Sequence, residues 1–142
     1  MFNKKLKIKF KKLNENAVMP TYGTKYSAGA DLYSAEEEVV INPGETAFIG
    51  TGIACAIPNY KVGLIYARSG LACKKGLAPA NKVGVIDSDY RGEIKVALHN
   101  HGKEPQTSTD RTNHRLERGH RGDDFDERSA LCPSGRQVRL YH

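Results

Sequence analysis

Apolar and polar residues alternate in short runs along the first hundred residues of the chain. In the first run, Leu6, Ile8 and Phe10 alternate with lysines over residues 5–13. A period of two predicts a strand with one buried and one solvated face. Comparable runs, bounded by Gly, Pro and Asn residues, predict further strands over residues 28–34, 39–41, 46–50, 53–57, 62–66, 77–82, 84–86 and 94–98.

Helical periodicity is almost absent, and the sequence predicts a single short helix after Arg68, Ser69 and Gly70. Many short strands joined by turns that contain Gly and Pro are typical of an all-β barrel or jelly roll. A chain of 142 residues has the length of one domain. The expected fold is therefore a single barrel of short antiparallel strands.

The stretch over residues 84–96 predicts a strand, a tight polar turn and a second strand, which together would form a hairpin. Asp87 and Asp89 supply turn chemistry, because short polar side chains bond to their own backbone. Gly92 permits a bulge or a close backbone approach. Asp89, two residues beyond Asp87, is expected to have a structural role in the turn. Such a hairpin would hold Asp87 and Tyr90 rigidly, as a general base requires; the competing interpretation is an ordinary hairpin with a soluble tip.

The formal net charge of +6 would suit an anionic partner. Six of the lysines, however, lie between residues 4 and 12, where they form the solvated face of the first predicted strand. This pattern does not require nucleic acid, and we expect no specific nucleic-acid partner.

The sequence has no signal-peptide pattern and no apolar run of membrane-spanning length, so we expect no membrane partner. Its three cysteines, Cys55, Cys73 and Cys132, are odd in number and lack the spacing of a metal site. They favour a reducing compartment. We expect the cytoplasm, with a nuclear location or a virus-encoded protein as alternatives.

Composition changes abruptly at residue 106. Residues 1–105 contain 13 Lys and 2 Arg, whereas residues 106–142 contain no Lys and 7 Arg. The second segment has 8 residues of the hydrophobic set in 37 and no sustained alternation. We therefore divide the chain into a β domain over residues 1–106 and a polar, arginine-rich tail over residues 107–142, which we expect to be irregular.

Three stretches, AGADL (residues 28–32), ARSGLA (67–72) and GVIDSDYRGE (84–93), resemble motifs one, two and three of the trimeric dUTPases in order and spacing. The resemblance covers about residues 5 to 105. It implies a jelly-roll or β-clip subunit, a homotrimer, and Mg²⁺-dependent hydrolysis of dUTP to dUMP and pyrophosphate, which limits uracil in DNA and supplies dUMP for thymidylate synthesis. Two alternatives remain: a dUTP-binding, inactive or regulatory protein, and a relative similar to dCTP deaminase.

The resemblance also implies roles around the third motif. Asp87 looks like the general base that activates the water attacking the α-phosphorus. Tyr90 resembles the deoxyribose platform, whose ring leaves no room for a ribose hydroxyl. Asn81 stands where the family places its uracil-contacting Asn, and Val85 and Lys95 are further expected substrate contacts.

The other two motifs are expected to serve the phosphates. Similarity to the family assigns Arg68, Ser69 and Gly70 to the triphosphate, where an Arg adds a charge-assisted fork. Without the resemblance, the same residues would be an ordinary helix N-cap with a surface Arg. Asp31 is expected to support Mg²⁺ indirectly, through water, because Mg²⁺ keeps several waters and takes phosphate oxygens.

The tail departs from the family, whose fourth motif has the form Gly-Asp-Arg-Ile-Ala-Gln and whose fifth ends in Phe-Gly-Ser-Thr. If the codons of residues 109–114 are read in a frame shifted by one nucleotide, codon degeneracy permits Arg-Ile-Ala-Gln followed by Ile-Ile. Reading residues 133–142 in the same way permits Gly-Gly-Lys-Phe-Gly-Ser-Thr. We therefore expect residues from about 107 onward to be an out-of-frame translation of a dUTPase C-terminus, with a divergent native tail as the alternative.

Overall fold

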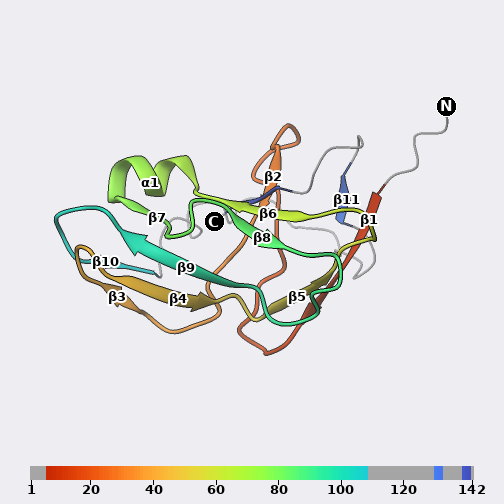
Figure 1. Cartoon of the computed structure of the whole chain (residues 1–142), viewed down its shortest axis with the longest axis horizontal. Coiled ribbons are helices and arrows are strands. Elements are labelled where there is room, and N and C mark those ends of the chain that lie inside the picture. Colours follow the sequence, from red (N-terminus) through yellow and green to blue (C-terminus); the bar gives the residue numbers. More distant parts are fainter. Residues whose placement is uncertain (1–5, 109–129, 133–138, 142) are drawn as a thin grey trace, which may run out of the picture.

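The computed structural model describes residues 6–108, 130–132 and 139–141, and they form an all-β fold with one short helix (Figure 1). The elements are β1 (Leu6–Lys12), β2 (Gly29–Asp31), β3 (Val40–Ile41), β4 (Thr46–Gly50), β5 (Ile53–Ala56), β6 (Gly63–Tyr66), α1 (Ser69–Lys75), β7 (Leu77–Pro79), β8 (Gly84–Ile86), β9 (Lys95–Asn100), β10 (Gln106–Thr107), β11 (Ala130–Cys132) and β12 (Arg139–Tyr141). Among these residues no helix is long and apolar enough to cross a membrane.

Within the described residues the strands pair into four small sheets, in the orders β11-β1-β5, β10-β3, β2-β12-β6-β8 and β4-β9-β7. Most pairs are antiparallel, but β12 runs parallel to both β2 and β6. In Figure 1, β6 and β8 lie in one layer and β4 and β9 in another, with α1 at the end near β7. Short strands in opposed layers are the arrangement expected of a jelly roll.

In the part of the chain that the structure describes, the core consists of two apolar clusters. The larger contains the buried residues Ile8, Ala17, Ala30, Leu32, Ile53, Cys55, Ile57, Ile65, Ile86, Ile94 and Val96. The smaller contains Ile41, Ile49, Leu77 and Leu98. Because Ile86 and Ile94 both belong to the larger cluster, the core fixes both ends of the connection between β8 and β9.

The alternation in the sequence located most of these elements. β4 has the predicted bounds, β1, β5 and β6 lie within their predicted ranges, and the predicted short helix is present as α1, which begins at Ser69 rather than after Gly70. The helix ends at Gly76, which has a left-handed conformation (φ 69°) that Gly adopts without steric cost.

The predicted hairpin over residues 84–96 is wrong. β8 pairs with β6, and β9 pairs with β4 and β7, so the two strands belong to different sheets. The connection over residues 87–94 is longer than the two to five residues of most hairpin loops. Alternation shows which face of a strand is buried but not which strand is its neighbour.

The tail contains strands that the sequence did not predict. β10 spans the proposed boundary at 106/107, β11 pairs with β1, and β12 lies between β2 and β6. Backbone pairing needs no particular side-chain pattern, which is why the composition gave no sign of them. The rest of the expectation of an irregular tail falls on residues 109–129, 133–138 and 142, which lie outside the described residues.

Candidate active site

The second motif forms the junction between β6 and α1. Arg68 occupies the N-cap position with an extended backbone (φ −74°, ψ 125°), and its side chain makes no capping hydrogen bond. Arg68, Ser69 and Gly70 are all exposed, and no acidic residue lies in the first turn of the helix. An exposed guanidinium beside first-turn N–H groups suits an anionic group such as a phosphate.

Asp31 lies at the same end of the sheet as this junction. Tyr141 pairs in parallel register with Asp31 on one side and with Tyr66 on the other. Asp31 and the end of β6 are therefore two strand spacings apart, roughly 10 Å. Asp31 is half-buried, and its backbone exchanges hydrogen bonds with Thr21 (2.7 and 3.3 Å). The first and second motifs thus come together.

The third motif turns tightly directly after β8. The Tyr90 amide donates to the Asp87 carbonyl (3.1 Å), and the Arg91 guanidinium donates to the carbonyls of Ser88 (2.6 Å) and Tyr90 (2.9 Å). Asp87 directly follows the buried Ile86 and is itself exposed. The turn therefore presents the Asp87 carboxylate to solvent from an anchored backbone. β8 ends before Asp89, so Asp89 lies in the turn rather than on a strand face.

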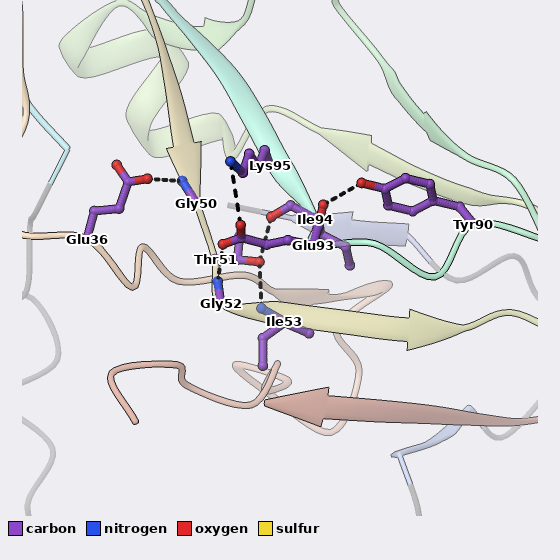
Figure 2. A network of polar contacts seen from close by, with 9 residues as sticks. All are labelled: Glu36, Gly50, Thr51, Gly52, Ile53, Tyr90, Glu93, Ile94 and Lys95. Carbon is purple, nitrogen blue, oxygen red and sulfur yellow. Dashed lines mark hydrogen bonds and ion pairs between the residues drawn. The ribbon is translucent and has the colours of Figure 1, made fainter. Parts of the chain in front are cut away.

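Tyr90 lies across Gly92. The Tyr90 hydroxyl donates to the Glu93 carbonyl at 2.7 Å (Figure 2). A Cβ on Gly92 would lie 2.6 Å from the Tyr90 Oη and 2.8 Å from its Cζ, closer than real Cβ contacts come. The sequence allowed a bulge or a close backbone approach at Gly92; the structure shows that the Tyr90 side chain approaches it closely.

The side chain of Glu93 ties this segment to the turn between β4 and β5 (Figure 2). Its carboxylate accepts a hydrogen bond from the buried Gly52 amide (2.9 Å) and pairs with the Lys95 ammonium at 3.6 Å. Glu36 accepts from the neighbouring Gly50 amide (2.8 Å). Two carboxylates from distant segments thus satisfy the amides of one tight turn.

Thr51 links the same turn to the chain beyond Glu93. Its hydroxyl is buried, donates to the Ile94 carbonyl (2.7 Å) and accepts from the Ile53 amide (3.2 Å). Sequence reasoning missed Glu36, Thr51 and Glu93. The available signal was a Gly-Thr-Gly step between two buried strands, since its amides need acceptors that neither strand supplies.

The remaining predicted contacts lie along β8 and at the start of β9. Asn81 is exposed in the turn before β8, and Val85 is 62% exposed opposite Leu64. Lys95 is exposed at the first position of β9, with its ammonium directed to Glu93. These positions are open to solvent, and their roles as substrate contacts stay predictions.

Arg68 and Asp87 are not brought together within one chain. In the antiparallel pair of β6 and β8, Ile65 lies opposite Gly84 and Gly63 opposite Ile86. Arg68 follows the C-terminal end of β6, whereas Asp87 lies beside its N-terminal end. The positions of Arg68 and Asp87 along β6 differ by six residues, which correspond to roughly 20 Å of extended strand. The phosphate-binding and base candidates therefore lie at opposite ends of one sheet.

The sequence was compared with known families and proteins. The family described as dUTPase matches residues 15–112. The chain belongs to the dUTPase family. It is 55% identical over 100 residues to the deoxyuridine 5'-triphosphate nucleotidohydrolase of Nautilia profundicola, covering 70% of this chain and 69% of that one. The enzyme of the same name from Desulfitobacterium hafniense is 50% identical over 103 residues, covering 71% and 68%.

Solved dUTPase structures share the fold. A point mutant of the dUTPase from phage phi11 of S. aureus, described with a structural Mg(II) ion, superposes with a TM-score of 0.62 at 39% identity, covering 67% of this chain and 60% of that one. A point mutant of the Staphylococcus bacteriophage 80alpha dUTPase with dUpNHpp gives 0.63 at 38% identity, covering 68% and 55%. The chain thus spans less than two thirds of these two dUTPases. Hydrolysis of dUTP is the activity for which its sequence relatives are named.

Proposed function

We propose that this dUTPase-family chain carries the machinery to hydrolyse dUTP to dUMP and pyrophosphate. The observation that supports it most strongly is the anchored turn that presents the Asp87 carboxylate beside Tyr90, within a family match that spans residues 15–112. Asp87 would orient a water and take its proton as it attacks the α-phosphorus, a contribution of about 10²–10⁴-fold for a positioned base.

Nucleotide binding and sugar selection are assigned to exposed side chains of the second and third motifs and of the neighbouring strands. The Arg68 guanidinium and the amides of Ser69 and Gly70 would hold the phosphates and offset the charge that develops on them. The Tyr90 ring, held in one orientation by Glu93 and Gly92, would exclude a 2′-hydroxyl. Asn81, Val85 and Lys95 complete the proposed nucleotide contacts.

The residues at the first motif fit Mg²⁺ held mainly by substrate. Asp31 is half-buried, and its Oδ2 lies 4.0 Å from the place of a Cβ on Gly23, in a loop that also carries Ser27 and Thr24 hydroxyls. Among the described residues there is no group of three His, Cys, Asp or Glu side chains that could hold a metal. A single carboxylate acting through water suits an ion that keeps its waters and takes phosphate oxygens. When bound, the ion would neutralise phosphate charge.

The separation of Arg68 from Asp87 supports a shared site in a homotrimer. A nucleotide held by Arg68 of one copy could not reach Asp87 of the same copy across roughly 20 Å of strand. A second copy would supply Asp87 and Tyr90. Phe48, 71% exposed on β4 opposite Ala97 of β9, is an apolar candidate for contact between copies.

For the tail we propose that residues from about 107 onward are an out-of-frame translation of a dUTPase C-terminus. The family match ends at residue 112, close to the change in composition. The printed chain then lacks the arm that closes over the nucleotide and excludes water, so its turnover would be low and its trimer weak.

Binding of dUTP without turnover is not favoured over hydrolysis, because the dUTPase family match spans residues 15–112 and the relatives carry nucleotidohydrolase names. The dCTP deaminase interpretation is not favoured, since the relatives carry nucleotidohydrolase names. We place the protein in a reducing compartment, the cytoplasm, because Cys55 and Cys73 are both free thiols.

The test compares two proteins. One has the sequence of this chain, and the other is encoded by the same gene with a single nucleotide deleted near codon 107. Pyrophosphate release from dUTP should be restored by the deletion and abolished again by Asp87→Asn, while affinity for a non-hydrolysable analogue changes only a few-fold. Turnover by the Asp87→Asn variant would remove Asp87 from the mechanism. Failure of the deletion to encode the two missing motifs would refute the frameshift.

A further inference from the structure

Two histidine rings lie against each other at the end of β9, away from the residues assigned to the nucleotide. The ring centroids of His99 and His101 are 4.3 Å apart, with an angle of 60° between the planes. The two residues are separated by one position on an extended chain, so their side chains rise on the same face. The His101 amide donates to the Gly76 carbonyl (2.8 Å), which continues the pairing of β9 with β7 beyond the last strand residue.

The backbone between the two histidines is fixed by hydrogen bonds of a buried side chain. Asn100, the residue between them, is fully buried. Its side-chain NH₂ donates to the carbonyls of Ile41 (2.9 Å) and Glu104 (2.8 Å), and its Oδ1 accepts from the Gly102 amide (2.8 Å). Three hydrogen bonds therefore fix the one residue that sets the relative position of the two histidines.

A hydrogen bond with Thr46 distinguishes the two nitrogens of the His99 ring. Its Oγ1 lies 2.8 Å from Nδ1 of His99, across the β4–β9 register. If Nδ1–H donates to this hydroxyl, the lone pair of His99 is on Nε2. A hydrogen bond to the second ring nitrogen is the usual support of a metal-binding histidine, because it fixes both tautomer and ring orientation.

We propose that His99 and His101 form a bidentate site for a divalent late first-row transition metal such as Zn²⁺, with His99 binding through Nε2 and Thr46 as its supporting acceptor. Imidazole suits Zn²⁺, Ni²⁺ and Cu²⁺, whereas Mg²⁺ prefers oxygen ligands. Two nitrogens at ~2.1 Å from one ion lie roughly 3 Å apart, a separation compatible with ring centroids 4.3 Å apart. His99 is half-exposed and His101 exposed, so waters can complete the coordination.

The test is a Zn²⁺ titration of the full printed chain at slightly alkaline pH, since an imidazole ligand must be neutral. Long-range ¹H–¹⁵N spectra report the tautomer of each ring before Zn²⁺ is added, and calorimetry gives the affinity. We expect the Nδ1–H tautomer at His99, one strong binding event, and shifts of the ring nitrogens of both His99 and His101.

Three variants and a matched control separate the site from other histidines. His99→Gln and His101→Gln should each lose the strong event, and Thr46→Val should weaken it by about 10–100-fold, as loss of a supporting hydrogen bond does. His114→Gln combined with His120→Gln should leave it unchanged. Thermal unfolding checks that each variant folds; because nucleotide turnover is not measured, failure here leaves the proposed hydrolysis untouched. Equal Zn²⁺ affinity in His99→Gln, or Zn²⁺ shifts confined to other histidines, would overturn the proposal and leave a ring contact only.

Discussion

The Tyr90 hydroxyl donates a 2.7 Å hydrogen bond to the backbone carbonyl of Glu93, whose carboxylate in turn accepts from the buried Gly52 amide. The ring proposed to select the sugar is therefore attached to the core through a residue that sequence reasoning did not single out. Glu93 holds the Tyr90 segment by its backbone and the β4–β5 turn by its side chain. Selection of deoxyribose would depend on these two hydrogen bonds of Glu93 as well as on the Tyr90 ring.

Tyr90→Phe and Tyr90→Ala should distinguish the effect of the orientation of the Tyr90 ring on sugar selection from the effect of its size. Removing the ring should lower the ratio of kcat/KM for dUTP over UTP strongly, because nothing excludes the 2′-hydroxyl. Removing only the hydroxyl should lower the ratio less, since the ring stays but loses its anchor at Glu93. The measurement is that ratio in the frame-restored chain. Equal ratios in all three proteins would mean that Tyr90 only packs.

Glu93→Ala should destabilise the printed chain by about 1–3 kcal/mol, because it leaves the buried Gly52 amide without its acceptor. Glu93→Gln keeps an acceptor oxygen and should cost much less. Lys95→Met is the matched control: its ion pair with Glu93 is 57% exposed on the lysine side, and such pairs contribute about 0–1 kcal/mol. Urea unfolding compares the three. A Glu93→Ala cost no larger than that of Lys95→Met would show that the Gly52 contact is dispensable.

Gly92→Ala should force the Tyr90 ring to move, since its Cβ would lie 2.6 Å from the Tyr90 Oη. We expect a loss of about 1–3 kcal/mol in unfolding free energy, as for other overpacked sites. In a Tyr90→Ala background the same substitution should be nearly neutral, which a double-mutant cycle measures. Additive effects would show that the two residues do not meet in solution.

The thiols should differ in reactivity. Burial raises the pKa of the Cys55 thiol, and the positive charge of Arg91 offsets only part of this effect. Cys73 is exposed on α1. In a Cys132→Ser background, a thiol reagent should label Cys73 at once and Cys55 at least about 100-fold more slowly, at the rate at which β1 and β5 open. Comparable rates would contradict the pairing of β1 with β5.

Sequence patterns located the strands because alternation reports burial directly. The bounds of β4 follow from it. It could not predict that β8 pairs with β6 rather than β9, since partner choice depends on the whole sheet. It also missed Glu93 and Thr51, because a polar side chain that satisfies buried backbone groups looks like a surface residue in the sequence.

The central claim is that the nucleotide site combines Arg68 of one copy with Asp87 of another, and mixing two inactive variants tests it most directly. In the frame-restored chain, Arg68→Ala and Asp87→Asn should each lower pyrophosphate release from dUTP by about 10²-fold or more when assayed separately. After unfolding and refolding together, the mixture should recover a substantial part of the parent rate, because some shared sites receive an intact Arg68 and an intact Asp87. A mixture no more active than its components, in a sample shown to contain mixed trimers, would contradict the shared site.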